Sequence, residues 1–255
     1  MQMTSKQYLP TQLPLLPVRS KYWRPDNWFT PGRKAIFRQA AAEVWHLAAF
    51  IATIPAGCVY RFPAVTAGTR PPVVLVPGLL GKGLEFARLR KALSAQGYPV
   101  YIPRLGSQIG DIFTKSRQLA AYLARPELEG CILIGYSLGG WVSLALPAEA
   151  LTRIRQIVTV GVSFQGSRMS YCLPMFIAAH QLMPNSNFIR SQQPRLAQLR
   201  SAVVNIHARH DEITLPARTN KLRGSRQVSC AVSGHLNLVL SRQGIDTILK
   251  VLEEV

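Results

Sequence analysis

Acidic residues are scarce in this chain of 255 residues: 12 aspartates and glutamates stand against 30 lysines and arginines, for a formal net charge of +18. A surface of this sign attracts nucleic acid or anionic lipid. The sequence lacks zinc-finger spacing, an RNP-like aromatic motif and a helix-turn-helix signature, so no nucleic acid is expected as a partner. The charge favours an anionic membrane surface as a partner, with an ordinary solvated basic surface as the alternative.

Cysteines are also few. The chain has four, and none of them forms a C-x-x-C pair. So few thiols in a chain of this length argue against a disulfide framework and favour a reducing compartment. The pattern predicts no metal site. Cys131 and Cys230 lie in apolar runs and are expected to be small core residues.

Long hydrophobic runs are missing as well. One uncharged stretch, residues 44–60, is at the lower limit of about 17 residues for a transmembrane helix, and Pro55 and Gly57 interrupt it. Three interpretations stay open. The stretch is a weak transmembrane or signal-anchor helix, a helix at a membrane interface with Trp45 and Phe50 inserted, or a helix packed on the domain that follows.

Composition divides the chain into three parts. Residues 1–34 are rich in proline, basic and aromatic residues, which predicts a poorly ordered or surface-bound arm. Residues 35–70 contain the apolar helix, and we expect membrane association through residues 35–60, with a cytoplasmic location as the alternative. Residues 71–255 are expected to form one α/β domain.

Short β-branched runs alternate with helical patterns throughout residues 71–255. Such alternation predicts a mostly parallel central sheet with helices on both faces. The expected strands lie within residues 73–76, 99–105, 130–136, 154–162, 201–216 and 226–235, and the expected helices within 84–98, 111–126, 137–151 and 242–255.

A single serine lies between glycines where a buried strand is expected to turn into a helix. Residues 135–139, Gly-Tyr-Ser-Leu-Gly, match the pattern G-x-S-x-G. In a strand–turn–helix setting this pattern presents a nucleophile on a sharp, strained turn, which explains the small neighbours. We predict that Ser137 is a catalytic nucleophile.

A serine hydroxyl needs a base to take its proton, and in this setting an acid and then a histidine follow the serine. His235 comes directly after an expected strand and is the predicted base. Asp211, at the end of the preceding strand, is the predicted acid that orients it, with Glu212 as the alternative. The histidines set aside are His180, His207 and His210.

The negative charge that develops during acyl transfer needs two N–H donors. One is expected to be the backbone N–H of Leu138, which follows the nucleophile. The other is expected in the glycine-containing loop 76–81, with the Leu79 N–H as first choice and Leu80 as second.

Four segments carry a family resemblance: VPGLLG at 76–81, GYSLGG at 135–140, GVSFQGS at 161–167 and LMPNSNFI at 182–189. They resemble the HGLLG loop, the nucleophile elbow, the GTPHxGS segment and the PGSxFL lid segment of small bacterial lipases and esterases of the α/β-hydrolase superfamily. From about residue 72 to the end, the resemblance implies an α/β-hydrolase fold with a short lid, esters with acyl chains as substrates, and no cofactor. Two departures, Pro77 for histidine and residues 162–164 for Thr-Pro-His, leave the substrate class open.

Residues 168–200 interrupt the alternation of strands and helices and contain many apolar side chains. An apolar insert near the carboxyl edge of the sheet is interpreted as a lid, with a helix that completes the core as the alternative. The apolar members are Met169, Tyr171, Leu173, Met175, Phe176, Ile177, Leu182 and Met183.

The sequence thus predicts a serine hydrolase that cleaves carboxylic esters of lipid or other hydrophobic acyl substrates. One alternative is an acyltransferase or thioesterase with the same three residues. The other is a hydrolase-fold binding protein without turnover, which the presence of all three residues disfavours.

Overall fold

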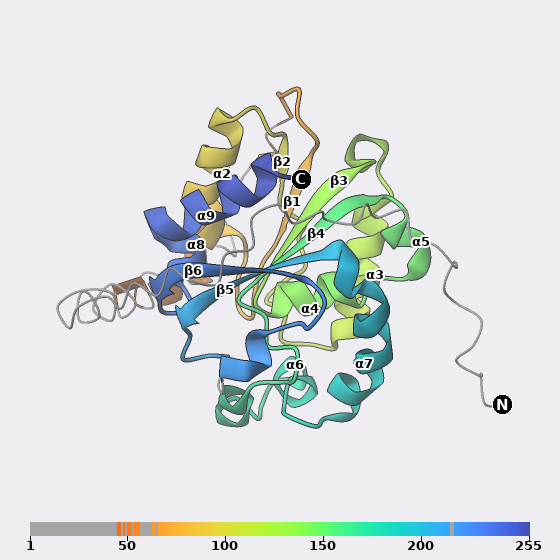
Figure 1. Cartoon of the computed structure of the whole chain (residues 1–255), viewed down its shortest axis with the longest axis vertical. Helices are drawn as coiled ribbons and strands as arrows, with labels where there is room; N and C mark the ends of the chain where they lie inside the picture. The colour runs from red at the N-terminus through yellow and green to blue at the C-terminus, as the bar shows by residue number, and fades with distance from the viewer. Residues whose placement is uncertain are drawn as a thin grey trace.

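The computed structural model of the chain describes residues 66–214 and 217–255, together with residues 45, 46, 48, 50–52, 54–56, 63 and 64. The arm predicted for residues 1–34 lies outside the described residues. The domain predicted for residues 71–255 is a central sheet with helices on both sides (Figure 1).

In the described part of the chain the sheet has six strands, and all neighbouring pairs are parallel. Their order is β2-β1-β3-β4-β5-β6. The chain therefore leaves β1 to one side for β2 and returns on the other side with β3, so a switch point lies between β1 and β3. In parallel sheets, ligands bind beyond the carboxyl ends of the strands at such a point. The strands are β1 Val73–Val76, β2 Val100–Tyr101, β3 Cys131–Tyr136, β4 Ile154–Val160, β5 Val203–His210 and β6 Arg226–Ser233.

The strands at the switch point are buried on both faces. All of β1 and β3 is buried, as expected for strands covered by two helical layers. The strand expected at 99–105 is only two residues long. Pro99 and Pro103 flank it and cannot donate to a strand ladder.

The helices form two layers. On one face α2 (Ala87–Ala95), α8 (Asn237–Leu240) and α9 (Arg242–Glu253) lie together, and on the other lie α3 (Ile112–Leu123), α4 (Leu138–Leu144), α5 (Ala148–Leu151) and α7 (Asn187–Leu199) (Figure 1). The helix expected at 137–151 is divided in two, since α4 ends at Leu144 and Pro147 directly precedes α5. The remaining short helices are η1 Leu84–Phe86, η2 Pro126–Leu128, η3 Arg168–Cys172, α6 Ile177–Gln181, η4 Arg200–Ala202 and η5 Ala217–Asn220.

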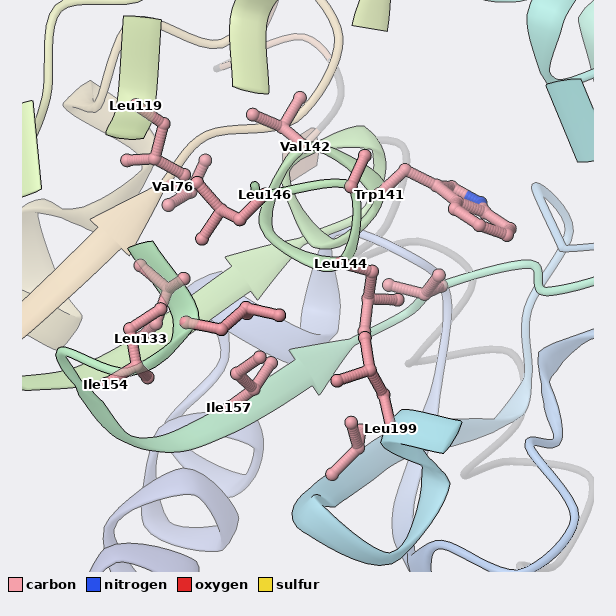
Figure 2. Close-up of a cluster of buried hydrophobic side chains, with 14 of the residues drawn as sticks. Val76, Leu119, Leu133, Trp141, Val142, Leu144, Leu146, Ile154, Ile157 and Leu199 are labelled. Atoms are coloured by element: carbon pink, nitrogen blue, oxygen red, sulfur yellow. The ribbon is translucent and has the colours of Figure 1, made fainter. Parts of the chain in front are cut away.

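Helix α4 is surrounded by the core on the second of these faces. Figure 2 shows Trp141, Val142 and Leu144 of α4 among strand residues such as Leu133 and Ile157. Burial of each such side chain contributes about 1.5–3 kcal/mol. This packing fixes the helix that follows Ser137, and with it the position of the serine.

The insert at 168–200 consists of two different parts. Helix α7 packs Phe188, Ile189 and Leu196 into the core, as the alternative interpretation expected. The first part instead exposes large apolar side chains, so the lid remains a proposal for this part alone. These side chains are Met169, Tyr171, Met175 and Ile177.

The described residues between 45 and 56, here called the N-terminal helix, are helical and contact the domain. The Nδ1 atom of His46 lies 2.7 Å from Oδ1 of Asn237, and Phe50 packs, partly buried, against the core on the face that α2, α8 and α9 cover. Trp45 stays 72% exposed. In the described part of the chain, every helix is too short or too polar to cross a bilayer.

Candidate active site

Ser137 lies at the carboxyl end of β3, in the turn into α4. Its backbone has φ 53° and ψ −123°, a conformation that a residue with a side chain rarely adopts and that costs about 1–3 kcal/mol. Its N–H donates to the carbonyl oxygen of Val160 at 2.8 Å, which ties the turn to β4. The strained turn expected from the sequence is therefore present at this residue.

The glycines around Ser137 allow backbone segments to approach closely. A Cβ on Gly139 would overlap the carbonyl oxygens of Val76 and Pro77, at the end of β1. A Cβ on Gly135 would likewise collide with the backbone of Gly140. The nucleophile turn thus rests directly on the loop after β1.

Asp211 and His235 are hydrogen-bonded to each other and buried. His235 Nδ1 lies 2.8 Å from Asp211 Oδ2, and each residue is 5% exposed. Burial raises the pKa of Asp211, but the charge of His235 and hydrogen bonds from His235, Thr214 and Ile213 outweigh it, so the pKa lies below its usual value. An ionised Asp211 holds the proton of the ring on Nδ1, which directs Nε2 of His235 toward the role of base.

Two further side chains hold His235. Glu212, the alternative acid, accepts the backbone N–H of His235 through Oε1 at 3.2 Å. Tyr136 donates its hydroxyl to the carbonyl oxygen of His235 at 3.3 Å, and the two rings are 5.1 Å apart. Neither contact could be predicted from the sequence, because each joins residues far apart in the chain.

The imidazole of His235 reaches the strand beside the nucleophile. A Cβ on Gly161 would lie 2.9 Å from Cε1 of His235. Gly161 directly follows Val160, the residue that accepts the Ser137 N–H. The structure therefore brings Ser137, Asp211 and His235 to one edge of the sheet, beyond β3, β5 and β6.

The three histidines set aside lie in other settings. His207 is buried within β5, where burial and then the charge of Lys221 lower its pKa to about 4, which keeps it neutral. His180 in α6 bonds to the carbonyl oxygen of Pro174 at 2.6 Å. The carbonyl oxygen of His210 accepts the N–H of Gly234, just before His235.

The loop after β1 has a tight turn beside the nucleophile. A Cβ on Gly78 would lie 3.1 Å from Cβ of Ser137. The N–H of Gly81 closes the turn on the carbonyl oxygen of Gly78 at 3.1 Å. The N–H of Leu80, the second choice for an oxyanion donor, donates to Ser107 at 2.8 Å. Within the described residues no hydrogen bond uses the N–H of Leu79, the first choice.

Leu138 is the first residue of α4. Its N–H has no partner within the helix, and it shares the partial positive charge of the helix N-terminus. A negative charge on an oxygen beside Ser137 is stabilised there. For metal ions, the described residues offer no group of three or more His, Cys, Asp or Glu side chains.

Gln108 is a further residue of this region that the sequence did not reveal. It is fully buried in the segment after β2, and its side chain donates to the carbonyl oxygen of Pro77. Nothing in the local pattern Ser-Gln-Ile-Gly marks it.

A family of known proteins matches most of the α/β domain. A sequence model described as the alpha/beta hydrolase family matches residues 73–231, a range that includes Ser137 and Asp211 and ends just before His235. Searching curated proteins finds no match.

Solved structures share the fold at low sequence identity. Lipase BlEst2 from Bacillus licheniformis in its mature form has a TM-score of 0.60 at 16% identity, over 76% of this chain and 94% of that one. An alpha/beta hydrolase from Novosphingobium aromaticivorans has a TM-score of 0.54 at 18% identity, over 73% and 90%. The enol-lactonase from Burkholderia xenovorans has a TM-score of 0.52 at 14% identity, over 73% and 92%.

Proposed function

Because the chain belongs to the alpha/beta hydrolase family, we propose that it is a serine hydrolase that cleaves carboxylic esters of lipid or other hydrophobic acyl substrates. One observation carries this proposal: the hydrogen-bonded pair Asp211–His235 lies at the same sheet edge as a serine held in a strained turn. Structures of a lipase and an enol-lactonase with the same fold support it.

The mechanism follows from these groups. Nε2 of His235 takes the hydroxyl proton of Ser137 as Oγ attacks the ester carbonyl carbon. The backbone N–H groups of Leu138 and Leu79 stabilise the oxyanion. When the tetrahedral intermediate collapses, the imidazolium protonates the leaving alcohol. Water then attacks the acyl-enzyme with His235 as base, and the acid is released.

Asp211 stabilises the imidazolium that forms in each half of the reaction. Its pKa lies below the usual value, so the carboxylate is already ionised at neutral pH. The two N–H groups of Ile213 and Thr214, each 2.9 Å from Oδ1, keep Oδ2 directed at the ring.

An apolar surface in the first part of the insert supports a hydrophobic acyl substrate. The N–H of Ala178 in α6 donates to the carbonyl oxygen of Ile109 at 3.2 Å, which joins the insert to the loop after β2. Flexible methionines suit acyl chains of different lengths. The exposed apolar side chains are Ile109 of the loop, Phe113 in the first turn of α3, and Met169, Tyr171, Met175 and Ile177 of the insert.

Wild-type protein is expected to hydrolyse p-nitrophenyl esters, with kcat/KM for the C8 ester at least tenfold above that for the C2 ester. Each buried methylene contributes up to about 0.8 kcal/mol, so even partial burial of the longer chain produces this ratio. The measurement is release of p-nitrophenol over chain lengths from C2 to C16. Absence of turnover at every length, with a folded protein, contradicts ester hydrolysis.

We also propose that the N-terminal helix associates with an anionic membrane surface. Its exposed side includes Trp45 and Ile51, which are 72% and 57% exposed, while His46 and Phe50 face the domain. The net charge of +18 adds attraction to anionic lipid. The substrate of a lipid hydrolase lies in such a surface.

The double variant Trp45→Ser/Ile51→Ser is expected to lower binding to vesicles of phosphatidylglycerol and phosphatidylcholine about tenfold or more, because two apolar anchors are lost. Co-sedimentation measures the binding, and vesicles of phosphatidylcholine alone test the contribution of charge. A matched control is Met175→Ser/Ile177→Ser, which removes two exposed apolar side chains from the insert. Equal binding by wild type and the Trp45/Ile51 variant contradicts this role of the helix.

A further inference from the structure

The loop after β1, which carries Leu79, is held by residues 107–108 of the segment after β2. The carbonyl oxygen of Ser107 accepts the N–H of Leu80 at 2.8 Å. The side-chain amide of Gln108 donates to the carbonyl oxygen of Pro77 and, more weakly at 3.4 Å, to that of Gly78. Residues 107–108 therefore anchor the loop both before and after Leu79.

The backbone conformation of these residues is unusual. Leu80 has φ 61° and Gln108 has φ 52°, both in the left-handed region that favours glycine. Ser137 beside them has φ 53°. Only one other non-glycine residue of the described chain has positive φ, Asn185, so strained backbone gathers around this loop. Such strain persists where surrounding contacts enforce it, and it concentrates at functional sites.

The side chain of Gln108 is costly to bury. It is fully buried, and its Oε1 atom has no hydrogen-bond partner among the described residues. A buried polar atom without a partner destabilises the fold, and a methionine of similar size would avoid that cost. The amide nitrogen is the end of the side chain that makes contacts, and both of them are to the loop.

These contacts fix the direction of one particular N–H group. The carbonyl of Gly78 and the N–H of Leu79 belong to the same planar trans peptide unit, in which they point in opposite directions. Gly78 has no side chain to restrict its rotation. The Gln108 donor on the carbonyl oxygen of Gly78 therefore acts directly on the unit that carries the Leu79 N–H, and its donor on the carbonyl oxygen of Pro77 holds the peptide unit before it. Gly81 adds a third donor, 3.1 Å from the oxygen of Gly78.

The geometry points to Gln108 as a positioning residue that orients the Leu79 N–H toward the oxyanion. This inference rests on the proposed ester hydrolysis with Leu79 as a donor. Gln108 does not touch the reacting atoms in this account, since it acts through the peptide unit between Gly78 and Leu79.

Gln108→Met is expected to lower kcat for p-nitrophenyl butyrate about 10- to 100-fold, with KM changed less than threefold. Loss of a whole oxyanion donor costs about 10²–10³ in kcat, and a misdirected donor loses part of that. Affinity for a trifluoromethyl ketone, which forms an oxyanion on the serine, is expected to fall by a similar factor. A purely structural role would not produce this pairing of kcat with ketone affinity.

Gln156→Met is the matched control. Gln156 is also a buried amide, 2% exposed, and donates to the carbonyl oxygens of Ile157 and Ala202 at 3.1 and 2.7 Å, away from the loop after β1. It is expected to keep kcat within about threefold. An equal fall in kcat in Gln108→Met and Gln156→Met would overturn the proposal.

Gln108→Asn provides a second variant if the methionine variant does not fold. Asparagine tolerates positive φ better than glutamine, but its amide is one methylene too short to reach the loop. It is expected to fold and to lose kcat as the methionine variant does. If either variant folds and keeps the kcat and the ketone affinity of the wild type, the role of Gln108 is overturned. If the wild-type protein hydrolyses no ester, the proposed function itself is overturned.

Discussion

Ser137→Ala is expected to lower kcat/KM for p-nitrophenyl esters by roughly 10⁴- to 10⁶-fold, to a rate close to the uncatalysed one. Removal of Oγ removes the only group that can form the acyl-enzyme in the proposed mechanism, so His235 and Asp211 have nothing to activate. Alanine keeps Cβ at the strained position, so the turn with φ 53° is unchanged. The free energy of unfolding is expected to change by less than about 1 kcal/mol.

Ser143→Ala controls for the loss of a buried serine nearby. Ser143 lies in α4, is fully buried, and donates its hydroxyl to the carbonyl oxygen of Gly139 at 2.8 Å. Its variant is expected to retain activity within about threefold. Ester hydrolysis that survives Ser137→Ala, in protein purified free of host esterases, would show that the nucleophile lies elsewhere.

Asp211→Asn is expected to lower kcat about 10³- to 10⁴-fold with a small change in KM. The asparagine amide can offer Nδ1 of His235 a donor in place of an acceptor, which favours the wrong tautomer, and it removes the charge that stabilises the imidazolium. Because the pKa of Asp211 lies below its usual value, the wild-type carboxylate is ionised throughout the neutral range. Measurement of kcat at neutral pH therefore compares the variant with a wild-type enzyme whose acid is fully ionised.

Two variants show whether the effect belongs to Asp211. Asp246→Asn removes an exposed carboxylate of α9 that lies 3.8 Å from Arg242, and it is expected to leave kcat unchanged. Glu212→Gln weakens only the contact to the backbone N–H of His235, and a loss below about tenfold is expected. A larger loss of kcat in Glu212→Gln than in Asp211→Asn would show that Glu212, and not Asp211, is the acid that orients His235.

The candidate site was predictable from sequence where its signals are local. The elbow at Ser137 is written in five consecutive residues, because a strained turn between a strand and a helix needs glycines at fixed positions. The carboxyl ends of β5 and β6 could also be located from the alternation of strand and helix patterns, and this suggested Asp211 and His235 as an acid and a base in that order along the chain. The hydrogen bond between them, at 2.8 Å, is what that order led us to expect.

The remaining features depend on contacts between distant segments. Gln108 meets the carbonyl oxygen of Pro77 only because β2 lies beside β1 in the sheet. The insert at 168–200 has apolar side chains along its whole length, so composition could not separate α7, which joins the core, from the exposed part before it. The docking of His46 on Asn237 likewise joins residues far apart in the chain.

The most direct test of the account is covalent labelling of the wild-type protein with a p-nitrophenyl phosphonate, followed by mass spectrometry of the intact protein and its peptides. We expect one phosphonyl group per chain, located on Ser137, absent from Ser137→Ala and formed much more slowly in Asp211→Asn. Labelling of another residue, or no labelling of a folded protein by any such ester, would contradict the proposal that Ser137 is a nucleophile activated by His235 and Asp211.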